Sequence, residues 1–291
     1  MSSFQTVGII GKQHDDPRVA ATIGPLTEHL RRCGLGIRFE SETAQQLGAG
    51  DGLSLAGLGR SSDLIIVVGG DGTFLHAARE MAEFEVPLVG INLGRLGFLV
   101  DVSPDHIERR LDQILAGEYD ADARTLLDVR INGAAGRALN DIVVHKWNTV
   151  RMIEFETYID GQFVNAQRSD GIIISTPTGS TAYALSGGGP LIHPSLDALL
   201  LVPICPHTLS NRPLVVEGGS RIEIRICNYE PEQVRLTCDG QIDVPLAEGS
   251  PICIQRSVHR VRLLHPRGHD HYSILRAKLG WGGHTRTDQP C

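Results

Sequence analysis

The sequence predicts two domains, an α/β N-terminal domain with a mainly parallel sheet and a C-terminal all-β domain of the sandwich type. In the first part of the chain, short apolar strands alternate with segments of helical period. From about residue 124, apolar and polar residues alternate with period two instead. We place the α/β domain at 1–123 and the β domain at 124–269. A final helical segment within 270–291 is expected to pack back on the first domain.

Strands and helices are expected to alternate through residues 1–123. The predicted strands are 7–10, 37–39, 64–68 and 87–91. The helices are predicted from two apolar stripes, one of Val19, Ile23, Leu26 and Leu30 and one of Ile107, Leu111, Ile114 and Leu115. Such alternation indicates a parallel sheet with helices on both faces. Residues 48–59 contain five glycines, and we expect a surface loop there, with a mobile loop that closes over a ligand as the alternative.

Short strands separated by turns are expected in residues 124–269. The strands are predicted at 127–131, 142–144, 153–159, 172–174, 222–226 and 234–238. Asp160-Gly161 and Asp239-Gly240 are typical of hairpin turns. Several short strands of this kind indicate an antiparallel sandwich. Residues 273–279 then return to a helical pattern.

The composition excludes several classes of protein. Apolar residues make up 41% of the 291 residues and charged residues 21%, as in soluble globular proteins. No apolar run approaches the roughly 20 residues of a membrane span. The segment Met1–Gln5 lacks the features of a signal peptide, so we expect a cytoplasmic location and no membrane partner. The net charge of −7, without a basic run, argues against a nucleic-acid partner.

Neither the cysteines nor the histidines form a metal-binding motif in the sequence. The six cysteines include no C-x-x-C pair, so reduced thiols are expected rather than disulfides or zinc ligands. His269-Asp270-His271 has no companion ligands nearby in sequence and is interpreted as a surface cluster. No metal-ligating residue is predicted.

A glycine-rich turn, Gly69-Gly70-Asp71-Gly72, directly follows the apolar strand 64–68. Glycine allows unusual backbone angles and lets a ligand approach the main chain closely. The amides of the helix that follows would suit a phosphate group. A carboxylate at Asp71 then makes sense if it orients a hydroxyl, accepts its proton or helps to hold a cation. The alternative is that Asp71 only caps the helix.

A second glycine-rich turn, Asn92 to Gly97, follows the strand 87–91. Ligands of parallel α/β sheets gather at the carboxyl ends of the strands. Both turns stand at that end, which supports a binding site there.

The β domain carries a dense polar stretch around the strand 172–174. Arg168-Ser169-Asp170-Gly171 precedes this strand, and a run of Ser, Thr and Gly follows it and ends at Tyr183. Hydroxyls can read the edges of a sugar or a base, and Tyr183 offers a face for stacking, as a nucleotide site requires. The alternative is a low-complexity loop. Asn140-Asp141 adds an amide and a carboxylate, although alone it would be an ordinary turn.

Together these motifs resemble the bacterial NAD kinase family of Gram-negative type over nearly the whole chain. The resemblance rests on Gly69 to Gly72, on Gly90 to Leu99, on Asn140-Asp141, on Asp170 to Tyr183, and on the runs 202–207 and 278–281. Four such elements in this order and spacing are highly specific, whereas the first motif also occurs in lipid kinases and phosphofructokinases. Many relatives have Glu where this chain has Asp141, so the charge is kept and its reach is shortened.

The resemblance implies transfer of the γ-phosphoryl group of ATP to the 2′-hydroxyl of the adenosine ribose of NAD, which gives NADP. There is no Walker motif, so the phosphates must be held in another way. A divalent cation, most simply Mg²⁺, is expected to bridge the donor phosphates. Residues 1–123 would bind the phosphate donor and carry the catalytic group, and 124–269 would bind NAD. Family members are homo-oligomers, so a dimer or tetramer is expected.

The resemblance also implies roles for particular residues. Asp71 is expected to orient and deprotonate the 2′-hydroxyl. The expected phosphate contacts are Gly70, Gly72 and Thr73. Those expected at the adenosine half of NAD are Asn140, Asp141, Thr181, Ala182 and Tyr183, and Thr178 is expected among the residues that bind the nucleotides. Those expected at the nicotinamide end are Arg168, Asp170 and, from a neighbouring subunit, His207. For Arg168, a salt bridge to Asp170 is the alternative.

Two other functions stay open at this point. A lipid or sugar kinase would keep Asp71 but would need a groove for an acyl chain or a site for a sugar phosphate. The polar stretch that ends at Tyr183 argues against a lipid tail. A non-catalytic NAD sensor would bind the dinucleotide, yet would have no reason to keep a carboxylate in the phosphate turn.

Overall fold

The structure is a computed structural model that describes residues 4–13, 16–94, 96–227 and 229–281. The chain divides into two compact units, residues 1–123 with 261–291 (unit 1) and residues 124–260 (unit 2). The sequence places the second boundary at 269/270, whereas the structure has it at 260/261. The difference arises because the long strand β16 (Ile252–Pro266) contributes residues to both units.

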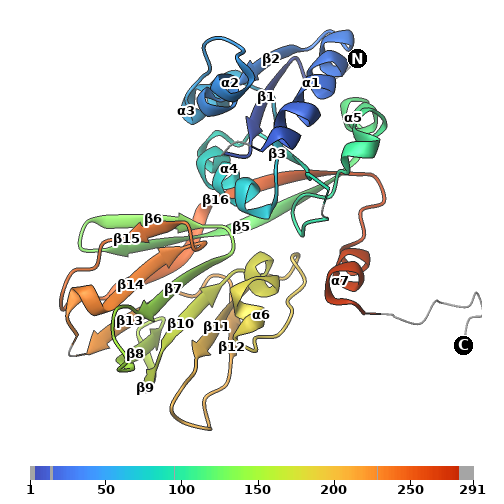
Figure 1. Cartoon of the computed structure of the whole chain (residues 1–291). Coiled ribbons are helices and arrows are strands. Elements are labelled where there is room, and N and C mark those ends of the chain that lie inside the picture. The colour runs from blue at the N-terminus through green and yellow to red at the C-terminus, as the bar shows by residue number, and fades with distance from the viewer. Residues whose placement is uncertain (1–3, 14–15, 95, 228, 282–291) are drawn as a thin grey trace, which may run out of the picture. The chain divides into compact units, whose positions relative to one another are not determined.

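Unit 1 is built on a parallel sheet (Figure 1). Its strands are β1 (Thr6–Gly11), β2 (Gly36–Phe39), β3 (Leu64–Val68), β4 (Leu88–Ile91) and the second half of β16. Their order is β2-β1-β3-β4-β16, and each neighbouring pair is parallel. Every residue of β3 is buried, as expected for a strand covered on both faces. The prediction of a mainly parallel sheet is confirmed.

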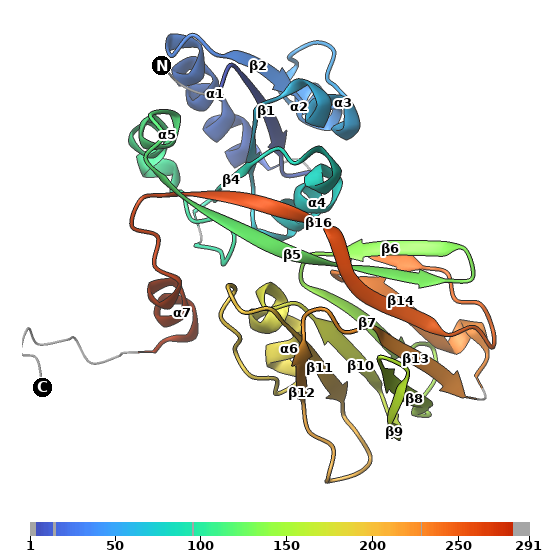
Figure 2. The same ribbon diagram turned by 180° about the vertical axis from the view of Figure 1, so that it is seen from behind.

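Helices cover both faces of this sheet (Figures 1 and 2). These helices are α1 (Pro17–Arg32), α2 (Ser41–Leu47), α3 (Leu55–Ser61), α4 (Asp71–Met81) and α5 (Ile107–Leu115), with short 3₁₀ turns at Ala82–Phe84 and Pro104–His106. A further helix, α7 (His271–Leu279), follows β16 and lies apart from this sheet. The apolar stripes of α1 and α5 share one core cluster with the strands. In both views, α2, α3 and α4 lie on the other side of the sheet.

The expected loop over residues 48–59 is wrong for its second half, because α3 begins at Leu55. The Ser54 hydroxyl accepts the amide of Gly57 at 3.1 Å and so caps the helix. Leu58 is fully buried, and Gly59 packs so closely on the ring of Phe84 that a side chain at 59 would collide with it. The cap and the burial offset the low helix propensity of glycine.

Unit 2 contains two antiparallel sheets. The elements not yet named are β5 (Tyr119–Ile131), β6 (Ala134–Ala138), β7 (Asp141–Lys146), β8 (Ile153–Ile159), β9 (Gln162–Ser169), β10 (Gly171–Ser175), α6 (Tyr183–Ser186), β11 (Ala198–Ile204), β12 (Leu214–Glu217), β13 (Ile222–Cys227), β14 (Val234–Cys238) and β15 (Ile242–Val244), with 3₁₀ turns at Thr178–Thr181 and Pro231–Gln233. One sheet has the order β12-β11-β10-β7-β14-β15. In the other, β13 lies between the first half of β16 and β8, and β9 follows.

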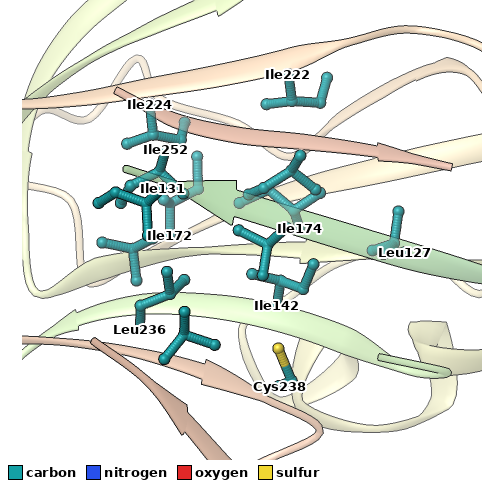
Figure 3. Packing of buried hydrophobic residues seen from close by; sticks show 14 of the residues in the cluster. Leu127, Ile131, Ile142, Ile172, Ile174, Ile222, Ile224, Leu236, Cys238 and Ile252 are labelled. Atoms are coloured by element: carbon teal, nitrogen blue, oxygen red, sulfur yellow. The ribbon is translucent and has the colours of Figure 1, made fainter. Parts of the chain in front are cut away.

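The core of unit 2 lies between these sheets, as Figure 3 shows. Ile222 and Ile224 of β13 and Ile252 of β16 approach it from one sheet, and Ile172 and Leu236 from the other. The period-two pattern puts alternate side chains on the inner face, and burying them is the main source of stability. The prediction of a sandwich-like β domain is therefore confirmed.

The C-terminal helix α7 belongs to unit 1, as the sequence predicts. The Asp270 carboxylate caps it by accepting the amide of Tyr272 at 3.0 Å. The Lys278 ammonium lies 5.4 Å from the centre of the Phe98 ring, a cation–π contact with the second glycine-rich turn. The expectation for 282–291 lies outside the described residues.

The described cysteines are free thiols: Cys33, Cys205, Cys227, Cys238 and Cys253. Among the described residues, no helix is long and apolar enough to cross a membrane.

Candidate functional site

Asp71 connects the two glycine-rich turns of unit 1. The buried strand β3 ends at Val68, and α4 begins at Asp71 after an extended Gly70. The carboxylate of Asp71 accepts the amide of Phe98 at 3.0 Å through Oδ2 and that of Leu99 at 3.0 Å through Oδ1. The side chain therefore holds the second turn, and helix capping does not account for it.

Glycine is required where the second turn approaches this carboxylate. A Cβ at Gly97 would collide with Oδ1 of Asp71. Gly94 has a φ of +104°, and its amide donates to Oδ1 of Asn92 at 2.9 Å. Arg95, part of the same motif, lies outside the described residues. The glycine spacing of this motif thus follows from close packing on Asp71.

The start of α4 places backbone amides that favour an anion beside the carboxylate of Asp71, which can accept a hydrogen bond. Gly70 and Gly72 are exposed, and Asp71 and Thr73 are partly buried. Amides in the first turn of a helix have no acceptor within the helix and favour negative charge. A carboxylate has about four lone-pair sites. The hydrogen bonds from the two backbone amides use two of them, so Asp71 can also accept a hydrogen bond from a hydroxyl group.

A buried carboxylate holds the far end of the second turn. Oδ2 of Asp101 lies 2.9 Å from Nδ1 of His265 and 2.9 Å from Nδ1 of His269, and the two imidazole rings are stacked 3.8 Å apart. Burial acts to raise the pKa of Asp101, but the hydrogen bonds and charges of the two histidines outweigh it and hold that pKa below its usual range. Of the expected surface cluster, Asp270 is exposed, whereas His269 is partly buried against Asp101, a residue distant in sequence.

Unit 2 contains a cavity of about 480 Å³ at the start of β7. It is lined by Asn140, Asp141, Val143, His145, Ala182, Tyr183, Arg235, Thr237, Asp239, Gly240 and Asp243. Of the residues expected at adenosine, the structure brings together Asn140, Asp141, Ala182 and Tyr183. The Tyr183 side chain is 46% exposed, so its ring is accessible for stacking.

Asp239 fixes the backbone on which Asn140 and Asp141 stand. Its carboxylate accepts the amides of Leu139 at 3.0 Å, Asn140 at 2.7 Å and Asp141 at 3.2 Å. Burial, together with the charge of Asp239, raises the pKa of Asp141 to about 7. The cavity therefore holds a carboxyl group that changes its charge near neutral pH.

The Ser/Thr/Gly turn is fastened to the same backbone. The Thr176 hydroxyl donates to the carbonyl of Leu139 at 2.6 Å and accepts the amide of Gly179 at 3.2 Å. A side chain at Gly179 would collide with the carbonyl of Asn140. These contacts place Ala182 and Tyr183 at the cavity.

Thr178 and Thr181 do not line this cavity. Thr178 is buried, and its hydroxyl accepts from Nη1 of Arg124 at 3.2 Å. The Thr181 hydroxyl donates to the carbonyl of Thr178 at 3.2 Å. Both side chains therefore have structural partners, Thr178 in β5 and Thr181 within the turn.

The residues expected at nicotinamide lie at the other end of β7. Asp170 forms an ion pair with Lys146, the last residue of β7, at 2.7 Å. The structure thus pairs Asp170 with Lys146, whereas the alternative given for Arg168 was a salt bridge to Asp170. The amide of His207 donates to the carbonyl of Arg168 at 2.9 Å, which brings these two residues together. Five residues of β-strand, about 17 Å, separate Lys146 from Asp141.

Sequence reasoning missed the part of the cavity that β14 and β15 supply. These residues are Arg235, Thr237, Asp239 and Asp243. They reach Asn140 because β14 pairs with β7, with Cys238 opposite Ile142. Asp239 was recognised only as part of a hairpin turn. Its positive φ of 52° agrees with a turn, but nothing in the sequence near it shows the neighbouring strand.

The fold and these sites define a class of protein. A parallel α/β unit has a carboxylate among anion-attracting amides, and an antiparallel unit has a polar cavity with an accessible aromatic ring. This combination is that of a nucleotide-dependent phosphotransferase.

Comparison with known proteins identifies the family. Residues 55–119 match the ATP-NAD kinase N-terminal domain, and residues 139–265 match the ATP-NAD kinase C-terminal domain. The NAD kinase of Nitrosococcus oceani is 49% identical in a match that covers 96% of this chain and 97% of that protein. The NAD kinase of Halorhodospira halophila is 47% identical in a match that covers 96% of this chain and 94% of that protein. The chain belongs to the NAD kinase family. The predictions of this family and of its kinase function are confirmed.

Solved structures agree with the family. Yeast NADH kinase, solved in complex with NADH, has a TM-score of 0.87 and 26% identity over 98% of this chain and 90% of its own. An NAD kinase from Archaeoglobus fulgidus, solved in complex with ATP, has a TM-score of 0.75 and 25% identity over 95% and 99%.

Proposed function

We propose that Asp71 is the general base of a reaction in which the γ-phosphoryl group of ATP passes to the 2′-hydroxyl of the adenosine ribose of NAD. The observation that carries this proposal is the position of its carboxylate, held by the amides of Phe98 and Leu99 with acceptor capacity to spare. A bond forms between the 2′-oxygen and the γ-phosphorus while the γ-phosphorus bond to the β,γ-bridging oxygen breaks. The hydroxyl proton passes to Asp71, and ADP leaves.

The phosphates of ATP bind at the start of α4. Gly70 and Gly72 are exposed and have no side chain to keep the phosphates away, and Thr73 adds a hydroxyl. Asp71 is the one carboxylate of this motif, a donor set that fits Mg²⁺ held mainly by substrate phosphates and water. Bound Mg²⁺ would neutralise the charge that develops on the transferred group.

The adenosine half of NAD binds in the cavity of unit 2. Asn140 and Asp141 supply an amide and a carboxyl group on a backbone fixed by Asp239, and Tyr183 supplies a ring for stacking. The structural contacts of Thr178 and Thr181 favour an indirect role for them, through the position of Ala182 and Tyr183. The NADH and ATP bound to the two structural relatives support a dinucleotide acceptor and a nucleotide donor.

Arg168 and Asp170 serve the nicotinamide end of NAD, and His207 serves it in a neighbouring subunit. Lys146, the ion-pair partner of Asp170, stands about 17 Å from Asp141 along β7, so the two ends of an extended dinucleotide can be bound at the two ends of this strand. The edge strand β12 of the sheet that contains β7 exposes two apolar residues, Leu214 at 39% and Val215 at 48%. An outer strand with exposed apolar side chains is suited to pair with another copy. A homo-oligomer is thus part of the proposal, and the cytoplasmic location stays a prediction from the sequence.

Formation of NADP from NAD, ATP and Mg²⁺ tests the proposal, measured with an NADP-specific dehydrogenase. We expect product that requires both ATP and Mg²⁺. Parallel reactions replace ATP with polyphosphate and NAD with NADH, and they define the donor and the acceptor. Product from polyphosphate but not from ATP would overturn the proposed donor, and no product from either donor would overturn the proposed reaction.

A further inference from the structure

Three different metal-ligating side chains converge where the end of α1 meets α5 in unit 1. His29 and Cys33 are four residues apart, on the last turn of α1 and at its C-cap, so they point to the same side. Nε2 of His29 lies 3.8 Å from Sγ of Cys33 and 2.9 Å from Oδ1 of Asp112 on α5. The three donor atoms all lie within 4.8 Å of one another.

These separations fit the coordination shell of a tetrahedral ion. With the usual zinc bond lengths, a nitrogen and a sulfur ligand stand about 3.6 Å apart and a nitrogen and an oxygen ligand about 3.4 Å apart. The observed 3.8 Å and 2.9 Å each differ from these values by only a few tenths of an ångström. Small side-chain rotations would complete the geometry.

The surroundings of His29 favour metal binding at Nε2. The other ring nitrogen, Nδ1, faces Oε1 of Glu108 at 3.8 Å, and Glu108 is itself held by Arg32 at 2.7 Å. A carboxylate on the far side of the ring is the usual second partner of a metal-bound histidine. Asp112 and Glu108 also line a surface hollow of about 880 Å³, which gives an ion a path from solvent.

The cluster of Asp101, His265 and His269 lacks this geometry. Its two imidazole rings are stacked, and both Nδ1 atoms face the same carboxylate oxygen.

We infer that His29, Cys33 and Asp112 form a binding site for a divalent transition-metal ion of the zinc class. The ligand set of one nitrogen, one sulfur and one oxygen suits Zn²⁺ or Co²⁺ and not Mg²⁺, which prefers oxygen ligands. Water or a small anion would take the fourth position. The bound ion would join α1 to α5 and stabilise unit 1, independently of the phosphoryl transfer proposed above.

Titration of the full chain with Co²⁺ in excess Mg²⁺ tests this site, because a thiolate ligand gives Co²⁺ a distinct near-ultraviolet charge-transfer band. We expect one Co²⁺ per chain with this band, and displacement of Co²⁺ by Zn²⁺. Cys33→Ser should lose the band, and Asp112→Asn should weaken Zn²⁺ binding about tenfold or more. Both residues are exposed or on the surface of their helix, so the fold should survive.

Cys205→Ser, which removes another exposed thiol, is the matched control and should keep the band. Zn²⁺ should also raise the unfolding temperature of the wild type and of Cys205→Ser, but not that of Cys33→Ser. The inference is overturned if the wild type binds no Co²⁺ at micromolar concentration, if it binds Co²⁺ without the charge-transfer band, or if Cys33→Ser keeps the band.

Discussion

Two carboxyl groups lie close together at the cavity of unit 2, and they have different tasks. Asp239 accepts hydrogen bonds from three backbone amides, while Asp141 is buried beside it. Burial and the neighbouring charge together raise the pKa of Asp141 to about 7. The protonated form of Asp141 can donate a hydrogen bond, and the ionised form can only accept.

The raised pKa of Asp141 predicts how stability depends on pH. Between about pH 4 and pH 7 the folded chain keeps a proton on Asp141 that the unfolded chain has lost, so the free energy of unfolding falls as the pH rises. Asp141→Asn removes this contribution. In urea denaturation, the free energy of unfolding of the variant should equal that of the wild type near pH 4. It should then exceed the wild-type value increasingly up to pH 8, by at most about 4 kcal/mol.

Asp243→Asn is the control for this experiment. Asp243 lines the same cavity, but its side chain is 62% exposed and lies 3.4 Å from Arg235. Water screens this exposed charge, so Asp243→Asn should not reproduce the gain in stability that is expected of Asp141→Asn up to pH 8. A pH-independent difference for Asp141→Asn would contradict the account of Asp141.

Individual site residues were predictable where a motif stands on consecutive residues. Asn140, Asp141, Ala182 and Tyr183 were expected together, and all four line one cavity. Asp239 was not expected there, because an Asp-Gly turn looks the same whether its carboxylate faces solvent or three amides. Its position follows from the pairing of β14 with β7, which is a long-range property.

At the scale of elements, the second glycine-rich turn is held at two points. At the first point, Asp71 accepts hydrogen bonds from the amides of Phe98 and Leu99. At the second point, two residues after Leu99, Asp101 is hydrogen-bonded to His265 and His269. Both carboxylates belong to unit 1, and so does the segment that carries the histidines. The turn is therefore positioned by charge-assisted hydrogen bonds rather than by apolar burial alone.

Asp101→Asn should loosen this turn and lower the free energy of unfolding by about 1–3 kcal/mol near pH 6. Because the folded-state pKa of Asp101 is depressed, its contribution is present above about pH 4 and is lost as the pH falls further. The difference in free energy of unfolding between variant and wild type, measured by urea denaturation, should therefore become smaller from pH 6 to pH 3.

Asp105→Asn changes an exposed carboxylate in the nearby 3₁₀ turn and should leave stability unchanged throughout this range. The proposed role of Asp101 would be contradicted if Asp101→Asn were as stable as the wild type at pH 6, or if the stability difference between them grew toward pH 3.

Elements with a clear apolar period were predictable, and short ones without it were not. The stripes of α1 and α5 and the buried run of β3 all gave correct elements. In α3, two glycines within seven residues hide the pattern, and the helix depends on its Ser54 cap and on packing against Phe84. Such tertiary contacts override local propensity.

For the whole molecule, the exposed apolar side chains of the edge strand β12 predict an oligomer. Sedimentation at micromolar concentration should show a particle larger than the 31.5 kDa chain. Leu214→Asp with Val215→Asp should yield monomers with reduced NAD kinase activity, since His207 then has no neighbour to serve. The matched change Val258→Asp, at a residue 89% exposed outside β12, should leave the particle unchanged. A monomeric wild type would contradict this prediction.

The division into an α/β unit and a β unit was predictable because the period of the apolar residues changes along the chain. The second boundary was not, because β16 runs without interruption through residues of both units. The function was predictable from four motifs in a fixed order, and the family comparisons agree with it over nearly the whole length.

The most direct test of the central claim compares NADP formation by the wild type and by Asp71→Asn, with equilibrium binding of NAD measured on both. The asparagine keeps the size of the side chain and one acceptor for the loop amides, but it cannot take the hydroxyl proton. We predict a fall in kcat of about 10²–10⁴ with NAD binding little changed. Turnover by Asp71→Asn at nearly the wild-type rate would contradict the assignment of Asp71 as the base.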